Sequence, residues 1–386
     1  MVDVSKVRKI LLVTNDLGPH AGGIESFILG LLGEMNGHEI VIYTSSQRGD
    51  GEFDAKLASK YGVEVIRDRA RVLLPTPRVN RSVSKVMKEY KSEYIWFGAA
   101  APLGWMAGHL RQNGAKRIVA LTHGHEVWWS KVWPFSLIMR VISRQIDVIG
   151  YLGEFTKSAM RKAVGDSVNM QQIAPGISID HFIPGEKNSS LLQKYNLQNK
   201  LVIVCVGRLV HRKGQDRLIQ AMPQIINQVP NAHLLLVGEG PRGEHLKKLV
   251  AKDQLENCVT FVGRVSYDQL PLHLQLGDIF AMPSRSRFFG LEVEGLGIVY
   301  LEASSCGIPV IAGASGGAPD AVLQGETGLV VDGNNPSAIA QSVVTLLHDS
   351  NLRGAMSKRG REWAQSQWSW KIWGKRFNQL LLGQDS

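Results

Sequence analysis

Residues 288–312 read FFGLEVEGLGIVYLEASSCGIPVIA and carry two glutamates, Glu294 and Glu302, with seven residues between them. The second half of this stretch predicts a helix from about Leu296 to Ser305, because its apolar side chains pack well and Gly307-Ile308-Pro309 ends it. A short, strand-like apolar run follows the helix directly. This order of turn, helix and buried strand is typical of an α/β sheet.

The N-terminus of the predicted helix is a candidate anion site. Its amide groups would face a phosphate, and glycine lets a ligand approach the backbone closely. These amides belong to Gly295, Leu296, Gly297 and Ile298. Eight residues of helix separate the two glutamates by about 12 Å along the axis, beyond the ~5–10 Å between the paired carboxylates of glycosidases. Glu294 and Glu302 would therefore hold the two ends of one long ligand. The spacing alone leaves open a second interpretation, an amphipathic helix with two solvated glutamates.

Length and composition predict two globular domains. The chain has 386 residues, of which 44% are hydrophobic and 20% charged, and this length exceeds one ordinary domain. No apolar run approaches the ~20 residues of a bilayer span and no signal peptide is recognisable, so we expect a soluble, cytosolic protein. The three cysteines lack ligand spacing, which favours buried thiols over disulfides or a zinc site.

Short buried runs alternate with helical patterns along the chain, as in parallel sheets with helices on both faces. The pattern begins at Arg8–Thr14 and restarts at Leu201–Val206, after a looser stretch rich in turn residues. We therefore expect domains at 1–174 and 185–366, a linker at 175–184, and a last helix within 367–386. Ligands of such sheets bind at the carboxyl ends of the strands.

Several candidate residues follow predicted strands. Gly22-Gly23 and His123 do so in the first domain, although glycine pairs are mostly turns and a single histidine is more often a structural hydrogen-bonding group. In the second domain, Arg208 follows a strand and Lys213 lies at the next helix start. Two cations and a helix N-terminus at one strand end can hold a pyrophosphate. A pair of surface cations is the alternative.

The pair of glutamates resembles the E-x7-E motif of the family-4 retaining glycosyltransferases. Matching segments flank it, namely Pro283-Ser284 before the motif and Gly307–Ile311 and Gly325–Gly328 after it. The resemblance covers nearly the whole chain and implies an α/β protein of the GT-B fold. In that fold two Rossmann-like domains face a cleft that binds a nucleotide sugar, and a C-terminal helix crosses back to the first domain. This chain departs from the family pattern where Leu296 replaces a phenylalanine and Asp320 a glutamate.

The resemblance also implies roles for the candidate residues. Arg208 and Lys213 would hold the donor diphosphate and stabilise it as it leaves, a role that other transferases give to a metal ion. Glu294 would contact the transferred sugar, Glu302 the ribose, and His123 the sugar from the first domain. His125 is a less favoured candidate for the role of His123. The glycine loop Gly22-Gly23 would close over the phosphates, supported by Glu25, and the backbone of Gly263, Arg264 and Val265 would contact the nucleobase. No Asp-x-Asp motif occurs, so we expect neither a metal nor another cofactor.

A basic segment adds a further feature. The formal net charge is +10, and eight basic residues against two acidic ones lie between Arg67 and Lys91. A helix at 78–91 would carry Val79, Val83, Val86, Met87 and Tyr90 on one face and Arg78, Arg81, Lys85 and Lys88 on the other. The cationic face could attach to anionic lipid head groups, as a similar surface does in lipid-acceptor members of the family. An ordinary solvated face is the alternative.

Within the family, the whole chain is most like the GDP-mannose-dependent transferases of actinobacterial phosphatidylinositol mannoside synthesis. This likeness implies transfer of the second mannose, in α-1,6 linkage, to a phosphatidylinositol mannoside by a metal-independent, SNi-like mechanism. The expected partners are a nucleotide-sugar donor and an anionic lipid on the inner face of the plasma membrane, where the protein would be peripheral. One alternative is a transferase that uses UDP-sugars and a soluble acceptor. A remote alternative is a nucleic-acid-binding protein. Only the positive net charge suggests it, and the sequence contains no recognition motif.

Overall fold

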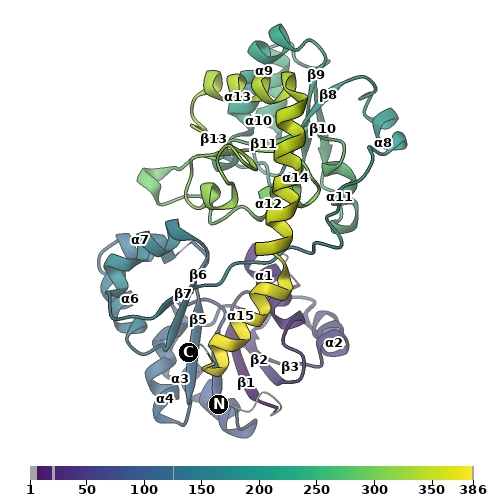
Figure 1. Cartoon of the computed structure of the whole chain (residues 1–386). Coiled ribbons are helices and arrows are strands. Elements are labelled where there is room, and N and C mark those ends of the chain that lie inside the picture. Colours follow the sequence, from purple (N-terminus) through teal and green to yellow (C-terminus); the bar gives the residue numbers. More distant parts are fainter. Residues whose placement is uncertain (1–6, 20–21, 125, 385–386) are drawn as a thin grey trace. The chain divides into compact units, whose positions relative to one another are not determined.

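The computed structural model describes residues 7–19, 22–124 and 126–384 (Figure 1). The chain divides into two compact units, of which unit 1 comprises Met1–Gly176 with Trp370–Ser386 and unit 2 comprises Ile177–Ser369. Each unit is built around one parallel β-sheet. The α/β class predicted from the alternating pattern is therefore confirmed.

The described strands of unit 1 pair in the order β3-β2-β1-β4-β5-β6-β7. They are β1 (Lys9–Thr14), β2 (Glu39–Ser45), β3 (Glu64–Asp68), β4 (Tyr94–Phe97), β5 (Arg117–Leu121), β6 (Val148–Tyr151) and β7 (Met170–Gln172). The helices are α1 (Gly23–Gly33), α2 (Asp50–Tyr61), α3 (Pro77–Glu89), α4 (Ala107–Gln112), α5 (Glu126–Lys131), α6 (Phe135–Ser143), α7 (Glu154–Val164) and α15 (Trp370–Leu382), with a 3-10 helix η1 (Leu103–Met106) before α4. This strand order reverses direction between β1 and β4, as in Rossmann-like sheets.

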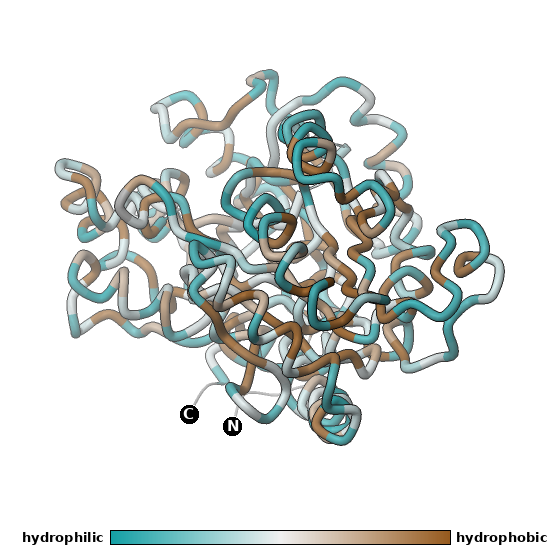
Figure 2. The backbone as a smooth tube through the Cα atoms, turned by 90° about the horizontal axis from the view of Figure 1, so that it is seen from above, coloured by the Kyte–Doolittle hydropathy of each residue, from teal (hydrophilic) through white to brown (hydrophobic). Residues whose placement is uncertain are grey.

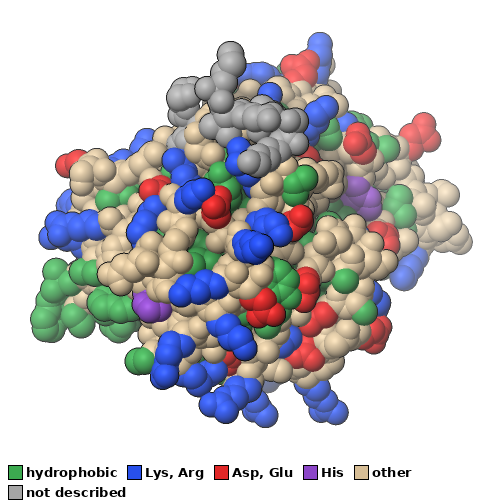
Figure 3. All heavy atoms as spheres, turned by 90° about the horizontal axis from the view of Figure 1, so that it is seen from below, with side chains coloured by type: hydrophobic (Ala, Val, Ile, Leu, Met, Phe, Trp, Pro, Cys, Tyr) green, Lys and Arg blue, Asp and Glu red, His purple; other side chains and the backbone are tan. Residues whose placement is uncertain are grey.

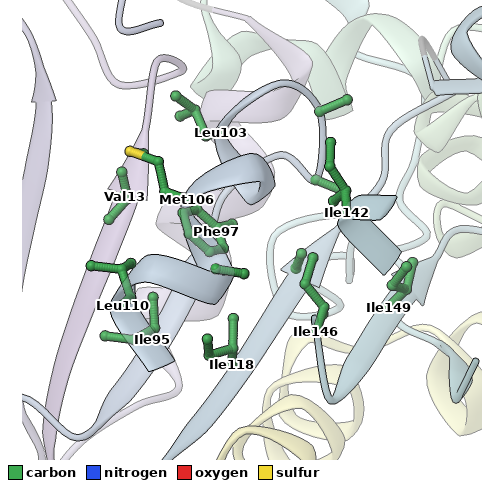
Figure 4. Packing of buried hydrophobic residues seen from close by; sticks show 14 of the residues in the cluster. Val13, Ile95, Phe97, Leu103, Met106, Leu110, Ile118, Ile142, Ile146 and Ile149 are labelled. Atoms are coloured by element: carbon green, nitrogen blue, oxygen red, sulfur yellow. The ribbon is translucent and has the colours of Figure 1, made fainter. Parts of the chain in front are cut away.

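One face of the unit 1 sheet is covered by α3, η1, α4, α6 and α7. Their inward side chains form one hydrophobic cluster with alternate residues of the strands (Figure 4). In β4, Ile95 and Phe97 belong to this cluster and Trp96 does not. Successive strand side chains point to opposite faces, so Trp96 points to the other face of the sheet.

On that other face, Trp96 is fully buried against Phe377 of α15, with the ring centroids 4.7 Å apart. Trp370, at the start of α15, lies against Phe27 of α1, with the centroids 6.2 Å apart. Helices α1 and α15 thus cover the face opposite α3, α4 and α6. The end of the chain is an integral part of unit 1, although 193 residues of unit 2 precede it.

The described strands of unit 2 pair in the order β10-β9-β8-β11-β12-β13. They are β8 (Leu201–Val206), β9 (Ala232–Val237), β10 (Val259–Gly263), β11 (Ile279–Met282), β12 (Val310–Gly313) and β13 (Gly328–Val331). The helices are α8 (Ser189–Lys194), α9 (Gln215–Gln228), α10 (Gly243–Lys252), α11 (Leu270–Leu274), α12 (Ile298–Ser305), α13 (Pro336–His348) and α14 (Ser350–Gln367). Short 3-10 helices lie at η2 (His211–Lys213), η3 (Tyr267–Gln269), η4 (Phe288–Gly290) and η5 (Ala318–Ala321).

Most of the stretch that we expected to be a linker is packed into unit 2. Phe182 is fully buried, and its carbonyl accepts hydrogen bonds from Ser305 Oγ at 2.7 Å and from Arg361 at 2.7 Å. These contacts fix residues 177–184 to α12 and α14. Of the cysteines expected to be buried thiols, Cys205 and Cys306 are buried and free, and burial raises the pKa of each to about 12.

Figure 2 shows short hydrophobic stretches in the interior, interrupted by hydrophilic turns and outward helix faces. None of the described helices combines the length and the apolar character that crossing a bilayer requires.

The packing of α15 predicts a strong effect of one substitution. Phe377→Ala should lower the free energy of unfolding of unit 1 by about 3–5 kcal/mol, because it opens a cavity beside Trp96. Ile372 lies exposed on the same helix, so Ile372→Ala should change that free energy by less than ~0.5 kcal/mol. Hydrogen exchange of the β1 and β4 peptides in increasing urea measures the free energy of unfolding of unit 1 alone. Equal effects of the two substitutions would contradict the placement of α15 in the core.

Candidate active site

The candidate donor site of unit 2 lies where the strand order reverses. Strands β8 and β11 are neighbours, with β9 and β10 beyond the first and β12 and β13 beyond the second. The turns that follow β8, β11 and β12 therefore lie beside one another at the carboxyl edge of the sheet, which is where α/β proteins bind ligands. These turns carry Arg208 with Lys213, residues 283–287, and residues 314–317.

The turn after β8 presents its two predicted cations differently. The side chain of Arg208 is exposed and makes no hydrogen bond or ion pair with the described residues. Lys213 is buried, and its backbone amide closes the η2 turn on Val210 O at 3.1 Å. Gly214 follows with φ +76°, and a Cβ there would lie 1.9 Å from Pro283 O. Only glycine lets the η2 turn pack this closely on the end of β11.

Glu294 is the electrostatic centre of these turns. One carboxylate oxygen, Oε2, lies 2.9 Å from Lys213 Nζ and accepts a hydrogen bond from Arg212 Nη1 at 2.6 Å. Burial by itself would raise the pKa of Glu294, but the charges and hydrogen bonds of Lys213 and Arg212 outweigh it and hold the pKa below its ordinary value. Glu294 is therefore an anion that two cations neutralise inside the protein.

The backbone around Glu294 is held from two sides. Its carbonyl accepts a hydrogen bond from Gly317 N at 2.8 Å, which ties it to the turn after β12. Three residues on, Gly297 adopts φ +81° directly before α12, where a Cβ would lie 2.4 Å from the ring of Tyr300. The hydroxyl of Tyr300 in turn donates to Met282 O at 2.7 Å, so α12 is fixed to the end of β11.

One expectation for this segment is wrong in detail. Helix α12 begins at Ile298 and not at Leu296. The backbone of Gly297 has a left-handed conformation, so Gly297 cannot belong to the right-handed helix that follows it. Gly295 and Leu296 therefore lie in the turn before the helix. Their amides, and those of Gly297 and Ile298, donate to no atom of the described residues. The four amides remain candidates for an anion, now presented by a turn and a helix start together.

Glu302, in the second turn of α12, lies in the opposite electrostatic environment. It is half-buried and has no ion pair among the described residues. Burial raises its pKa to about 7, although the charge of Lys213 lowers it. At neutral pH its carboxyl group is therefore near half protonation, and it can donate or accept a hydrogen bond.

The structure adds residues that the sequence analysis did not single out. Arg285 is buried; it donates to Asp216 at 2.8 Å and to His211 Nδ1 at 2.7 Å, and its backbone amide donates to Arg212 O at 2.8 Å. Burial and the charge of Arg285 both lower the pKa of His211, which suits a neutral ring that accepts this bond. Arg285 thus fixes the turn that presents Arg212 and Lys213. A strand end followed by the letters SRSR was the only sequence signal for it.

The third predicted donor segment of unit 2 ends β10. Gly263 has φ +82°, and its carbonyl accepts a hydrogen bond from Gly238 N at 2.8 Å. Arg264 is exposed and Val265 is half-buried. The segment lies two strands away from β8 in the sheet, and its contact with a nucleobase stays a prediction.

In unit 1, the expected glycine loop caps α1. Gly22 N donates to Glu25 Oε2 at 3.1 Å, and Glu25 is buried, which confirms that it supports this turn. A Cβ on Gly22 or Gly23 would meet no described atom within 4 Å. Packing therefore does not require these glycines, and the space in front of them is open to a ligand. The two residues that precede Gly22 lie outside the described part of the chain.

His123 follows β5 and leans across the end of β4. Its Nε2 lies 2.5 Å from Gly98 O, and its ring meets that of Phe27 edge-on with the centroids 5.6 Å apart. Because a carbonyl oxygen only accepts, Nε2 must carry the proton in the neutral ring. Its backbone amide donates to Glu126 Oε2 at 2.8 Å. The site thus fixes both the tautomer and the orientation of His123. His125, a less favoured candidate, lies outside the described residues.

The four predicted lipid-contacting cations do not form one group. Arg78 donates two hydrogen bonds of 2.8 Å to the buried carboxylate of Asp68, so its charge is neutralised inside unit 1. Its side chain is still 37% exposed, so what the structure corrects is the assignment of Arg78 as a free cation of that face. Arg81, Lys85 and Lys88 are exposed without ion pairs in the described residues, and they line a surface cavity of about 740 Å³ between α3 and α4. The other lining residues are Ser84, Glu89, His109 and Asn113.

Comparison with known proteins identifies the family of the chain. The family described as glycosyl transferases group 1 matches residues 188–363, which is most of unit 2. A solved structure of HepE from Anabaena, in complex with UDP, shares the fold with a TM-score of 0.82, at 20% identity over 97% of this chain and all of that one. Together with mannosyltransferase relatives that are 41–42% identical over nearly the whole chain, this match shows that the chain belongs to the group 1 glycosyltransferases, and the structural likeness shows the GT-B fold that the resemblance implied.

Two curated relatives match almost end to end. The GDP-mannose-dependent alpha-(1-6)-phosphatidylinositol monomannoside mannosyltransferase of Mycolicibacterium smegmatis is 42% identical over 97% of this chain and 98% of its own. The GDP-mannose-dependent monoacylated alpha-(1-6)-phosphatidylinositol monomannoside mannosyltransferase of Corynebacterium glutamicum is 41% identical over 98% and 99%. The described residues contain no group of three or more His, Cys, Asp or Glu placed to hold a metal; metal-independent transfer stays a prediction.

The raised pKa of Glu302 predicts a pH-dependent stability. The pKa of Glu302 is about 7 in the folded protein, whereas the ordinary pKa of a glutamate is 4.5. The carboxyl group therefore binds its proton more tightly in the folded state than in the unfolded state. Its contribution to stability is therefore complete below about pH 4.5 and is lost as the pH rises to 7. Glu302→Gln removes this loss, so the variant should be more stable than the wild type at pH ~8, by up to roughly 3 kcal/mol, and equally stable at pH ~4.5.

The control for this prediction is Glu256→Gln, which changes an exposed glutamate of the same unit. Urea denaturation at both pH values measures the difference. A Glu302 variant whose stability relative to the wild type does not change with pH would contradict the buried, half-protonated carboxyl group.

Proposed function

We propose that this protein transfers mannose from GDP-mannose to a phosphatidylinositol monomannoside lipid, forming the α-1,6 linkage named for its full-length relatives. The observation that supports it most directly is the set of cations at the end of β8. Arg208 is exposed and unpaired in the described residues, while Lys213 shares the carboxylate of Glu294 with Arg212. A diphosphate needs such donors, and a carboxylate beside them can accept hydrogen bonds from sugar hydroxyls.

The shared carboxylate suggests how the donor is received. Arg212 Nη1 is 2.6 Å from Glu294 Oε2 and so can hold this anion alone. Lys213 could then turn from Glu294 to the incoming diphosphate without leaving a buried charge unpaired. Glu294, ionised throughout, would bind the mannose hydroxyls, and Glu302 would bind the ribose.

The reaction that fits these groups takes place on one face of the sugar. The bond between mannose C1 and the phosphate oxygen breaks while the acceptor oxygen bonds to C1 from the same side. The acceptor hydroxyl passes its proton to the departing phosphate oxygen, and Arg208 and Lys213 stabilise the charge on GDP. No protein carboxylate is needed as a nucleophile, and the proposal requires no metal.

Unit 1 would contribute the lipid contact. Arg81, Lys85 and Lys88 line the cavity between α3 and α4, and cations at this density attract anionic head groups with about 1 kcal/mol each. We propose that this side of unit 1 attaches the protein peripherally to the cytosolic face of the membrane that holds the acceptor.

The activity itself gives the first test. With GDP-[14C]mannose and phosphatidylinositol monomannoside, the protein should form a dimannosylated lipid in buffer with excess EDTA. Arg208→Ala and Lys213→Ala should each lower turnover by roughly 30- to 1,000-fold, the effect of ~2–4 kcal/mol of lost transition-state stabilisation. Lys247→Ala, on the exposed side of α10, is the control. Transfer from UDP-sugars to a soluble acceptor in place of the lipid would refute the proposal, and loss of transfer in EDTA would refute its metal-free mechanism.

Charge reversal on α3 gives a separate test of the membrane contact. Arg81→Glu/Lys85→Glu changes the surface by four charges and should weaken binding to phosphatidylinositol vesicles by up to roughly 4 kcal/mol at low salt. At ~0.5 M salt the Debye length is only about 4 Å, so most of the difference should disappear. The matched control is Lys371→Glu/Lys375→Glu, with the same spacing on the exposed side of α15 and on the other face of the sheet.

Vesicle co-sedimentation measures both variants, and isothermal titration with GDP shows whether unit 2 is intact. If the α3 and α15 variants bind vesicles equally, the cations of α3 form an ordinary solvated face.

A further inference from the structure

The segment that joins β11 to α12 forms a small closed loop before it reaches Glu294. Arg287 and Glu292 pair as in an antiparallel bridge. The amide of Arg287 donates to the carbonyl of Glu292 at 2.9 Å, and the amide of Glu292 donates back at 3.2 Å. Their side chains pair as well, since Arg287 Nη1 lies 2.9 Å from Glu292 Oε2. We call residues 287–292 the clipped loop.

The tip of the clipped loop presents an aromatic ring to solvent. Phe288, the first residue of η4, is 61% exposed, although phenylalanine is among the residues most often buried. The guanidinium carbon of Arg287 lies over this ring, 4.6 Å from its centroid. Because Arg287 is itself held by Glu292, the ring is supported on one face. Most of the side chain remains accessible, so the ring offers a ligand an open apolar surface.

The backbone of Phe288 has a conformation that a bulky side chain disfavours. Its φ is +49°, in the left-handed region that glycine and asparagine adopt far more readily. Residues in this region persist where the surrounding structure holds them, and they are frequent at ligand sites. Here the paired Arg287 and Glu292 hold the tip. A turn that only had to change direction would fold more easily with asparagine or glycine at this position.

Positive charge near the loop would not by itself mark a site. Figure 3 shows Lys and Arg side chains spread over one face of the molecule, so exposed cations are common in this protein. The clipped loop differs because a paired cation, an exposed ring and a left-handed backbone occur together in Arg287 and Phe288.

Arg212 joins the clipped loop to the candidate donor site. Its Nε lies 4.0 Å from Glu292 Oε1, and its Nη1 donates to Glu294 Oε2 at 2.6 Å. One guanidinium group thus spans both glutamates. Along the chain the loop precedes Glu294, whereas α12 with Glu302 follows it. The loop therefore adjoins the end of the site where Glu294 is proposed to bind mannose, and Glu302 marks the other end.

Transfer on one face of the sugar brings the acceptor to this end. In the proposed reaction the acceptor oxygen bonds to C1 of mannose on the side from which the diphosphate leaves. The acceptor must therefore lie close to the cations that hold the diphosphate. Lys213 and Arg212 share Glu294 there, and Arg212 also reaches the clipped loop.

We propose that Phe288 binds a ring of the acceptor head group, with the C–H face of a mannose or inositol ring stacked on the open side of the phenyl ring. This inference rests on the proposed function and deepens it, because it assigns to unit 2 a residue that recognises the acceptor. The C–H face of such a ring is apolar while its edge carries the hydroxyls, so stacking removes apolar area from water and leaves the hydroxyls free for polar partners. Phe288 is then a determinant of acceptor specificity.

Substitutions of Phe288 separate the ring from the backbone. Asparagine tolerates a left-handed φ, so Phe288→Asn removes the ring and keeps the turn. At saturating GDP-mannose, this variant should lower kcat/KM for phosphatidylinositol monomannoside by roughly tenfold or more, and Phe288→Tyr, which keeps the ring, should restore most of it. Transfer should also fall relative to hydrolysis of GDP-mannose by water, which needs no acceptor ring. The control is Ile183→Asn, which changes another exposed apolar residue of unit 2.

Binding without transfer tests the contact itself. The probe is deacylated phosphatidylinositol monomannoside, titrated by calorimetry into protein saturated with GDP. Its Kd should be about tenfold higher for Phe288→Asn than for the wild type. Glycerophosphoinositol, which lacks the mannose, identifies the ring. A difference between the two proteins that persists with this second probe assigns the contact to inositol, and a difference that disappears assigns it to mannose.

The outcomes separate this inference from the proposed function. If Phe288→Asn transfers mannose and binds the probe like the wild type, the ring is an ordinary exposed side chain and the inference is wrong. It is also wrong if transfer and donor hydrolysis fall equally, because the loop then serves the donor. Unchanged GDP affinity shows that the variant is folded. Should the wild type bind the probe through Phe288 yet transfer no mannose, the proposed function would fail and this contact would stand.

Discussion

The carboxylate of Glu294, shared between Arg212 and Lys213, is the interaction on which the geometry of the candidate donor site of unit 2 depends. It joins the turn after β8 to the segment that leads into α12, and the two cations supply the charge that allows a carboxylate to remain ionised while buried. A single cation would balance the charge of Glu294. If a diphosphate then bound this cation, the carboxylate would be left unpaired. Two cations on one oxygen leave one positive charge in excess in the ligand-free protein, which suits the binding of an anion. Arg285, through Asp216, His211 and the carbonyl of Arg212, holds both cations in place.

The two glutamates of the E-x7-E motif lie close together in the sequence but in different electrostatic environments. Glu294 precedes α12, beside the cations of the η2 turn, and its pKa is held low. Glu302 lies inside the helix, where burial outweighs the more distant charge of Lys213 and raises the pKa to about 7. One carboxyl group is thus always an acceptor, while the other can change its protonation state near neutral pH. Such a difference suits the two ends of a nucleotide sugar. The sugar, which Glu294 is proposed to bind, is bonded to the diphosphate that leaves, whereas the ribose, which Glu302 is proposed to bind, does not react.

Much of the fold and part of the site could be predicted from the sequence, and the physical reason is locality. Buried strand runs and the 3.6-residue spacing of α3 are read within a few residues, and the elements predicted from them are confirmed. That the glycines before α12 bind a phosphate stays a prediction. Arg78 was misplaced because its partner, Asp68, had been counted only as an opposing charge in the same segment, and which cation a buried carboxylate pairs with depends on the packed backbone. Arg212 and Arg285 were not singled out for a similar reason: their partners are 82 and 69 residues away. The helix start was wrong by two residues, since Gly297 takes a left-handed conformation before the helix, at a position where a Cβ would clash with the ring of Tyr300 and only glycine fits.

Unit 1 distributes its charge and its apolar surface according to the two faces of its sheet. One face is closed by α1 and by α15, the last segment of the chain, whose Phe377 fills the core beside Trp96. The other face carries α3, α4 and α6, where a basic helix and a helix with exposed apolar side chains, Leu137 and Val141 of α6, lie on one side of the same core. Neither feature by itself distinguishes a membrane contact from an ordinary surface, because single exposed lysines and single exposed tryptophans are common. Their juxtaposition on one side of the core is the observation that favours the proposed membrane contact, since an anionic bilayer offers charge and hydrocarbon within a few ångströms of depth.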